Sequence, residues 1–320
     1  MNGKKVLVVG ATGGIGRAAV KELYNRGFLV KTFVRSEEKA KKYFLEFENI
    51  EIVEGDASDY GTVFNAASDA DYLFYGLNIP YSEWHQKAVP FLKVSLEVAA
   101  EKNLRFVFPG NVYLYGHAQY NPVDENHPHQ PHTRKGKIRA EMENLIKKYS
   151  GEKNVKFTIV RFPDFYGPFV VNGFSELIYI NALAGRKMMW VGDKKIPKEY
   201  IFIEDAGKCL VEAGISDKGV NQEFNVPSCG TITNTAYLSL ISKYGGRNSK
   251  TQIVNSNFVF YALGKISPVI NELREMLYLK REELFLDGTK FKNTYGFLPS
   301  TDFDSGIKKT FTWVKSFYNL

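Results

Sequence analysis

The sequence is poor in cysteine and contains no long hydrophobic run, no internal repeat and no low-complexity linker. Its two cysteines, Cys209 and Cys229, are too few for a disulfide framework or a four-thiolate metal site, and they favour free thiols in a reducing compartment. No run of about 18 apolar residues occurs, which argues against a transmembrane helix. The apolar residues 6–9 are too short for the core of a signal peptide. We therefore expect a cytoplasmic protein with no membrane partner.

The composition is that of a globular chain. Of 320 residues, 44% are hydrophobic and 24% are charged, close to the average for folded domains, and this length can bury a sizeable core. The net charge is +7, but Lys and Arg alternate with Asp and Glu and form no long block. No run of basic and aromatic residues indicates base stacking, so we expect no nucleic-acid partner.

The first half of the chain alternates between short apolar runs and helical patterns. Apolar runs of this length are typical of strands buried on both faces of a parallel sheet. Strand alternating with helix predicts an α/β fold with a doubly wound parallel sheet, the Rossmann arrangement. The expected strands are residues 6–9, 30–34, 50–53, 71–77, 104–108 and 155–160, and the expected helices are 15–26, 37–47, 82–102 and 135–149.

After about residue 165 this rhythm loosens. We expect a dinucleotide-binding domain over residues 1–165 and a smaller C-terminal α+β substrate lobe over 166–320, packed on it without a long linker. The lobe should lie over the carboxyl edge of the sheet, where open α/β sheets bind ligands. Its expected helices are residues 174–183, 205–213, 235–244, 258–277 and 305–317, with short apolar pieces at 188–191 and 200–203.

Three glycines, Gly10, Gly13 and Gly16, lie between the first expected strand and the first expected helix. Glycine permits positive φ and lets the backbone approach a pyrophosphate closely. The N–H groups that begin the following helix then face the anion. Because the motif stands at the first strand–helix junction of an alternating chain, it predicts a dinucleotide site rather than a merely tight turn.

The ends of the second and third strands carry charged residues that bear on the choice of cofactor. An acidic residue normally meets the ribose 2′-hydroxyl of NAD at the end of the second strand, but this chain has Val34 followed by Arg35. A guanidinium pairs well with a 2′-phosphate, so Arg35 favours NADP, with NAD possible. Asp56 follows the third strand, where an adenine ring would lie, and its carboxylate is placed to accept the exocyclic amine.

With these motifs the chain resembles the extended or atypical short-chain dehydrogenase/reductases of the NAD-dependent epimerase/dehydratase family. The resemblance covers nearly the whole chain. It is carried by the glycine loop, by 74–78 at the fourth strand, by the R-x-x-N-x-Y-G-P-like segment 161–168, and by the pieces 204–206, 224–226 and 306–313. It implies that the cofactor-binding residues are Gly10, Thr12, Gly13, Gly14, Ile15, Gly16, Arg35, Asp56, Ala57, Leu77, Asn78, Lys137 and Phe162. By analogy with the family, a homodimer is expected.

The catalytic group departs from the family pattern of Ser or Thr, Tyr and Lys. The K-x-x-A-E pattern at 137–141 makes Lys137 the equivalent of the family's lysine, and counting back four residues gives Thr133 where the family has Tyr. The position of the family's serine is held by Asn111. The aliphatic hydroxyl of a threonine is far less acidic than a phenol and cannot replace it as a general acid or base without a partner.

A proton donor must then come from elsewhere. His132, next to Thr133, is the first candidate because histidine titrates near neutral pH. Tyr113, Tyr115 and Asp164 are others, and Asn111, Tyr113, Asp164 and Tyr166 are candidate substrate contacts. His127, His129 and His132 have no carboxylate or cysteine at ligand spacing, so no metal site is expected.

Of three possible functions, two remain open at this stage. The first is an NAD(P)-binding oxidoreductase or epimerase-like enzyme that exchanges a hydride with a carbonyl or hydroxyl group of a small molecule or nucleotide sugar. The second is an NADP-binding sensor or regulatory protein that uses the same scaffold without turnover, which the missing tyrosine favours. An RNA-binding role is the least supported of the three.

Overall fold

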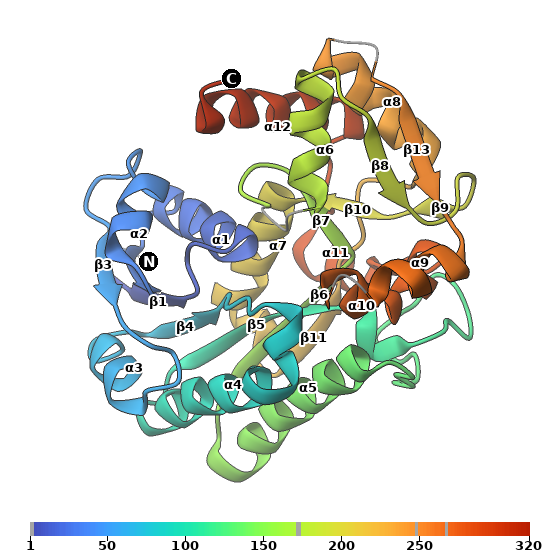
Figure 1. Ribbon diagram of the computed structural model, residues 1–320. Coiled ribbons are helices and arrows are strands. Elements are labelled where there is room, and N and C mark those ends of the chain that lie inside the picture. Colours follow the sequence, from blue (N-terminus) through green and yellow to red (C-terminus); the bar gives the residue numbers. More distant parts are fainter. Residues whose placement is uncertain (1–2, 171–173, 247–248, 266–267) are drawn as a thin grey trace.

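A computed structural model describes residues 3–170, 174–246, 249–265 and 268–320. Its centre is a seven-stranded parallel sheet with the strand order β11-β6-β5-β4-β1-β2-β3 (Figure 1). The chain builds one half outward from β1 to β3 and then returns to the other side of β1 with β4, so the order reverses between β1 and β4. The strands are β1 (Lys5–Val9), β2 (Leu29–Val34), β3 (Glu51–Glu54), β4 (Tyr72–Tyr75), β5 (Arg105–Asn111), β6 (Phe157–Phe162) and β11 (Gln222–Asn225).

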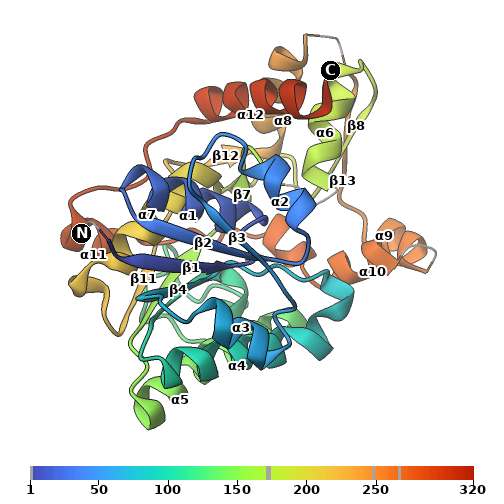
Figure 2. The same cartoon turned by 90° about the vertical axis from the view of Figure 1, so that its left-hand side faces the viewer.

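Helices cover both faces of this sheet, as Figures 1 and 2 show. The central strands are buried on both sides, which explains why they read as unbroken apolar runs. Two separate hydrophobic cores result, one on each face. One face carries α1 (Gly14–Asn25), α2 (Glu37–Tyr43), α7 (Ile203–Ile215) and α11 (Thr289–Tyr295), and the other carries α3 (Tyr60–Ala66), α4 (Trp84–Glu101) and α5 (Arg134–Lys153).

The segment from α7 to β11 returns from the second half of the chain to the sheet. Helix α7 packs against α1 so closely that a Cβ at Gly207 would lie 2.7 Å from the Cβ of Ala18. Strand β11 then pairs with β6 in parallel, with Phe224 opposite Val160. The predicted domain boundary at residue 165 assigns the segment from α7 to β11 to the smaller lobe. In the structure, this segment packs on the sheet and adds a strand to it.

Apart from α11, most of the rest of the second half forms the smaller lobe, with its own hydrophobic core. Its helices are α6 (Phe174–Leu183), α8 (Asn234–Gly245), α9 (Asn257–Gly264), α10 (Pro268–Arg274) and α12 (Phe303–Tyr318). Its strands form three short pairs, which are β7 (Asp164–Tyr166) with β10 (Tyr200–Phe202), β9 (Pro197–Lys198) with β12 (Ile232–Thr233), and β8 (Met188–Val191) with β13 (Thr251–Val254).

The structure departs from the expected elements in several places, of which two concern helices near the site. The helix expected over 258–277 is divided into α9, α10 and the 3-10 turn η4 (Leu277–Lys280), and α10 begins at Pro268, where a proline is well tolerated. Helix α3 was not expected, because its seven residues carry little apolar periodicity; Asp59 caps it by accepting from the N–H groups of Gly61 and Thr62.

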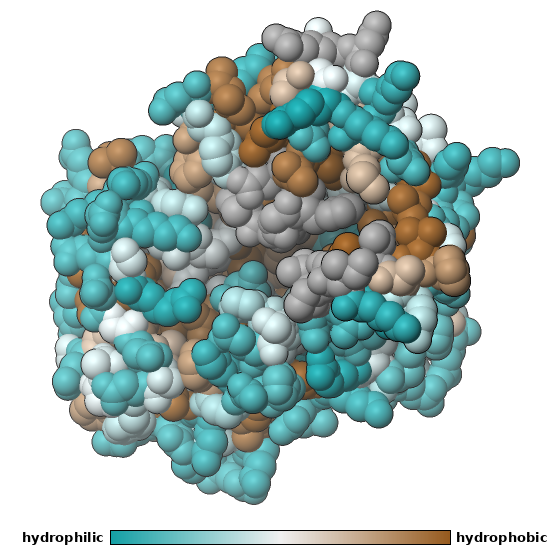
Figure 3. Space-filling view, in the orientation of Figure 1, coloured by the Kyte–Doolittle hydropathy of each residue, from teal (hydrophilic) through white to brown (hydrophobic). Residues whose placement is uncertain are grey.

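The surface differs between the two lobes. Figure 3 shows hydrophobic residues gathered over α6 and α9 of the smaller lobe, while the face below, over α3 to α5, is largely hydrophilic. Phe258 and Tyr261 on α9 and Leu177 on α6 are among the exposed large hydrophobic residues. Within the described residues, no helix combines the length and the apolar content needed to span a membrane.

Candidate functional site

The glycine loop between β1 and α1 is a close-packed turn. Gly10 has φ +76°, and a Cβ there would collide with the backbone of Leu77 after β4. A Cβ at Gly16 would collide with the carbonyl oxygen of Gly10. Gly13 is the N-cap of α1, and no side chain caps this helix. The first N–H groups of α1, at Gly14 and Ile15, are therefore available to an anion at the point where the strand order reverses.

The residues around this loop come from two other segments. Leu77 is half-buried and Asn78 is exposed, and the Cβ of Asn78 would be 4.0 Å from a Cβ at Gly13. Thr12 is half-buried beside them. On the other side, the carbonyl of Phe169 would lie 3.4 Å from a Cβ at Gly14, so the loop after β7 reaches the start of α1.

The end of β2 presents Arg35 to solvent. Ser36 caps α2 by accepting from the Lys39 N–H at 3.2 Å, and Arg35 remains exposed beside it. Asp56 accepts from the backbone and side chain of Ser58, and these bonds, with a smaller contribution from the charge of Arg35, lower the pKa of Asp56. The next residue, Ala57, is buried. A cation and a carboxylate therefore lie close enough to interact electrostatically at this end of the predicted cofactor site.

The start of α5 differs from the arrangement that the sequence predicted. Thr133 is buried as the N-cap, and its Oγ1 accepts from the Gly136 N–H at 3.0 Å. Lys137 is exposed. His132 is also exposed, and its ring stacks on that of His117 with centroids 4.1 Å apart. Partial burial and the proximity of His117 lower the pKa of His132.

The inner face of α5 instead carries Lys135 and Arg139. Lys135 is 1% exposed and is paired with Glu272 (2.6 Å) and Glu275 (2.5 Å) of the smaller lobe. The Arg139 guanidinium lies 4.8 Å from the centre of the Trp84 ring, next to α4. A signal for this orientation exists in the sequence, because the buried apolar residues of α5 continue the same helical face as positions 135 and 139, namely Ile138, Met142, Ile146 and Tyr149.

A polar cluster at the carboxyl ends of β4, β5 and β6 consists of one pair of residues beside the sheet and one pair from the smaller lobe. Tyr81 on η1 (Tyr81–Glu83) and Tyr113 on η2 (Val112–Tyr115) share a hydrogen bond of 2.8 Å between their hydroxyl groups. The side chain of Asn111, at the end of β5, accepts from the Tyr113 N–H at 3.1 Å. Asp164 on β7 forms an ion pair with Lys280 on η4. Burial raises the pKa of Tyr113 well above its ordinary value, and the Asp164 charge acts on both phenols in the same direction.

A second lysine of the smaller lobe lies near this cluster. Lys198 is buried, and its ammonium donates to the carbonyl of Glu282. Burial, followed by the nearby charge of Lys280, lowers the pKa of Lys198 to about 8. Two lysines of the smaller lobe thus lie near the carboxylates of Asp164, Glu282 and Glu283, and sequence reasoning did not single out either lysine.

Three other residues that the sequence analysis named pack against neighbouring side chains. Phe162 is fully buried in the core, and Tyr166 is buried in the core of the smaller lobe, where it packs on Gly306. His129 is half-buried against Tyr115, and burial lowers its pKa to about 4. Among the described residues, no group of three His, Cys, Asp or Glu is arranged to hold a metal ion.

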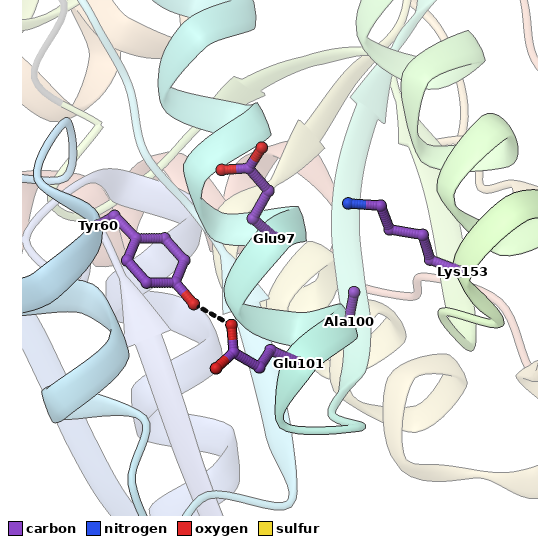
Figure 4. Close-up of a pocket in the computed structure, with 5 residues that line it drawn as sticks. All are labelled: Tyr60, Glu97, Ala100, Glu101 and Lys153. Carbon is purple, nitrogen blue, oxygen red and sulfur yellow. Dashed lines mark hydrogen bonds between the residues drawn. The ribbon is translucent and has the colours of Figure 1, made fainter.

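A surface pocket lies away from this site, near the C-terminal ends of α4 and α5 (Figure 4). In it the Tyr60 hydroxyl donates to Glu101, which raises the pKa of Tyr60 to about 12. Glu97, Ala100 and Lys153 complete the lining. It contains none of the residues that the sequence predicted for function.

Comparison with known proteins agrees with this architecture. The profile of the "NAD dependent epimerase/dehydratase family" matches residues 6–226, more than half of the chain, and the protein belongs to that family. A curated relative, a putative UDP-glucose 4-epimerase of Methanocaldococcus jannaschii, is 24% identical over 63% of this chain and 60% of its own, so the match spans less than two thirds of that relative. UDP-glucuronate 4-epimerase 1 of Arabidopsis thaliana is 23% identical over 99% of this chain and 78% of its own.

A solved structure extends the likeness to the complete fold. The UDP-glucose 4-epimerase of Thermotoga maritima, crystallised with UDP-glucose, superimposes with a TM-score of 0.81. The match covers 98% of this chain and 99% of that one at 18% sequence identity. The overall α/β arrangement and the smaller lobe are therefore shared with an epimerase fold.

Proposed function

We propose that the protein is a dinucleotide-dependent enzyme that exchanges a hydride with a hydroxyl or carbonyl group of a nucleotide sugar. The observation that carries this proposal is the meeting of two features at one sheet edge. The glycine loop, with its uncapped helix start, lies against Gly76 after β4, and the phenol pair Tyr81–Tyr113 follows β4 and β5. A place for a pyrophosphate and groups that can move a proton thus occur together at the reversal of strand order.

The loop residues Gly10, Gly13, Gly14 and Gly16 would hold the pyrophosphate of NAD or NADP, with Asn78 beside them. When bound, the nicotinamide supplies the hydride acceptor or donor. The family name supports NAD as the class of cofactor. A preference for NADP is a finer proposal that rests on Arg35, which is exposed at the end of β2 and offers a guanidinium to a 2′-phosphate.

We assign the proton transfer to Tyr113 rather than to Thr133, Lys137 or His132. The hydroxyl of Thr133 is engaged as a helix cap, and the side chain of Lys137 points to solvent. Tyr113 presents a phenol that is hydrogen-bonded to the phenol of Tyr81, and a proton can pass between the two hydroxyl groups. Asn111 fixes the backbone of Tyr113 and therefore acts as a positioning residue.

The smaller lobe supplies the groups for the anionic part of the substrate. Lys280 acts on Lys198 electrostatically, and so do the carboxylates of Glu283, Asp164 and Glu282. Among the described residues, Lys280 is paired with Asp164. A diphosphate placed between the lobes would relieve the repulsion between the two ammonium groups. The relatives that act on UDP sugars support a nucleotide sugar as this ligand.

The competing function is a dinucleotide-binding sensor without turnover. The observation that favours it is that the start of α5 offers neither Thr133 nor Lys137 to a ligand. Steady-state assays separate the two functions, with UDP-glucose and UDP-glucuronate as substrates and with NAD and NADP added. Enzyme function predicts interconverted sugars, and Tyr113→Phe should lower turnover about 10²–10⁴-fold while the affinity for the dinucleotide is kept.

The control is Tyr120→Phe, because the Tyr120 hydroxyl is exposed and bonds only to the nearby Asp124 in the described structure. Turnover by this variant should equal that of the wild type. A wild type that binds the dinucleotide but converts no sugar would favour the sensor. Unchanged turnover in Tyr113→Phe would remove the assigned role from Tyr113.

A further inference from the structure

Arg139 is a cation without a counter-charge. Within the described part of the chain, its guanidinium forms no ion pair and no hydrogen bond, and its Nε is buried without an acceptor. Its contacts are the faces of two aromatic rings, with centroid distances of 4.8 Å to Trp84 and 5.6 Å to Phe108. Burial lowers the pKa of Arg139, but a guanidinium stays protonated in proteins. A full positive charge is therefore held against apolar surfaces.

The other buried arginines each have a hydrogen-bonded partner, although among the described residues the Nε of Arg105 also lacks an acceptor. Arg161 is bound by both oxygens of Glu143, Arg17 by the carboxylate of Glu46, and Arg105 by the carbonyl of Ser216. Glu143, a carboxylate that acts on Arg139 electrostatically, already serves Arg161. A charge that is removed from water without a partner is costly, so folded proteins normally pair it.

Lys135, one helical turn earlier on the same face of α5, gives a direct contrast. Its ammonium is bound by the carboxylates of Glu272 and Glu275 and by the backbone carbonyl of Glu272 at 2.8 Å. The smaller lobe thus neutralises one cation of this face completely and leaves the next one free. Both side chains start from the same face of the same helix. They differ because acidic residues of the smaller lobe reach Lys135 and, as far as the structure describes the chain, do not pair with Arg139.

Arg139 also borders the polar cluster between the lobes. The Trp84 ring, which the guanidinium faces at 4.8 Å, also lies 5.0 Å from the Tyr81 ring and 6.4 Å from the Tyr113 ring between centroids. Arg139 keeps part of its surface exposed, although its Nε is covered. A ligand that reaches the Tyr81–Tyr113 pair would therefore meet this guanidinium.

We propose that Arg139 binds an oxyanion of the ligand, a carboxylate or phosphate group, at the carboxyl edge of the sheet. The planar guanidinium presents a fork of N–H donors that matches two oxygens of such a group. The oxyanion site stands on the unpaired guanidinium alone. The identity of the ligand as a nucleotide sugar rests on the proposed function.

The first experiment uses simple ions and does not depend on the proposed function. Thermal unfolding is measured with malonate, phosphate or chloride at equal ionic strength, for the wild type, Arg139→Met, Arg139→Lys and the matched control Lys135→Met. Malonate or phosphate should raise the Tm of the wild type and of Lys135→Met above the value in chloride. Arg139→Met should lose most of this rise, and Arg139→Lys should keep only part of it.

The same series separates binding from packing in the ligand-free protein. Arg139→Met removes an unpaired charge and should leave the Tm in chloride unchanged or higher, whereas Lys135→Met strands two carboxylates and should lower it. A wild type that neither ion stabilises overturns the site. So does an equal response of the wild type and Arg139→Met, or a fall in the Tm of Arg139→Met in chloride as large as that of Lys135→Met.

A second experiment identifies the source of the oxyanion by calorimetric titration with UDP-glucuronate, UDP-glucose and NAD. If it is the sugar carboxylate, Arg139→Met weakens UDP-glucuronate about tenfold or more and leaves UDP-glucose and NAD unchanged. If it is a phosphate, UDP-glucose or NAD weakens as well. A wild type that binds neither UDP sugar counts against the proposed function, and the ion series then decides on Arg139 separately. Affinities unchanged for every ligand that binds, with an unchanged ion response, overturn the inference.

Discussion

Helix α1 and helix α5 begin differently. The start of α1 presents backbone N–H groups, whereas the start of α5 presents side chains. At α1 the N-cap is Gly13, no side chain caps the helix, and a ligand would meet the backbone itself. At α5 the N-cap Thr133 supplies its own hydroxyl to the helix, and charged side chains follow it. The spacing of the glycines alone is enough to predict a site made of backbone groups. A site made of side chains also depends on the direction in which each side chain points.

The largest expected effect tests the backbone site. Gly13→Val places a branched side chain where even a Cβ would lie 3.3 Å from the carbonyl oxygen of Gly76. The added bulk would occupy the space that a pyrophosphate needs next to the first N–H groups of α1. We expect NAD affinity to fall at least about a hundredfold, the equivalent of roughly 2.7 kcal/mol, with little change in the far-ultraviolet circular dichroism. Calorimetric titration measures the affinity, and a folded variant that binds NAD like the wild type would contradict this assignment.

The contrast between these two regions also explains what could be predicted. Apart from α3, the order of strands and helices through β6 followed from apolar runs and from Gly10, Gly13 and Gly16. The placement of β11 could not follow, because residues 222–225 join the sheet only through their pairing with β6, more than 60 positions earlier in the chain. Similarly, Lys280 and Glu272 reach the site from the smaller lobe through contacts that no local pattern encodes.

The start of α5 shows a different kind of limit. Thr133 and Lys137 are four residues apart and share a helix face, so the spacing that the family resemblance requires is present. The structure places Lys135 and Arg139, two positions further on, on the buried face. A shift of two residues turns a helix face by about 200°, which exchanges the inner side for the outer one. The apolar residues of α5, rather than the motif, carry the information on orientation.

A smaller effect is expected at the end of β2, where the side chain and not the backbone would select the cofactor. Removing the guanidinium in Arg35→Ala should weaken NADP about tenfold, the equivalent of roughly 1.5 kcal/mol for one charge-assisted contact. The affinity for NAD should stay the same, because NAD has no 2′-phosphate. Both dissociation constants are compared for the wild type and the variant. Equal affinities of the wild type for NAD and NADP would refute the preference for NADP.

At Thr133 the expected effect is on stability. Thr133→Ala removes the hydroxyl that accepts from the Gly136 N–H and should cost about 1 kcal/mol of unfolding free energy, the usual value of a helix N-cap. Thr133→Ser keeps the cap and serves as the control. Urea denaturation measures both. Turnover per folded molecule should be unchanged in either variant, so a large loss of turnover in Thr133→Ala with stability preserved would assign the hydroxyl to catalysis.

The smallest expected effect is at Lys137, and it is the sharpest test of orientation. If the four-residue spacing decided the role, Lys137 would hold the nicotinamide ribose, and Lys137→Ala would lower both dinucleotide affinity and turnover strongly. The structure leaves this lysine exposed on the outer side of α5, so we expect the dissociation constant for NAD, turnover and the free energy of unfolding to match the wild type within about 0.5 kcal/mol. A tenfold loss of NAD affinity in Lys137→Ala would bring Lys137 into the site. In that case the face of α5 that carries Lys135 and Arg139 would be structural, and the family spacing would give the correct register after all.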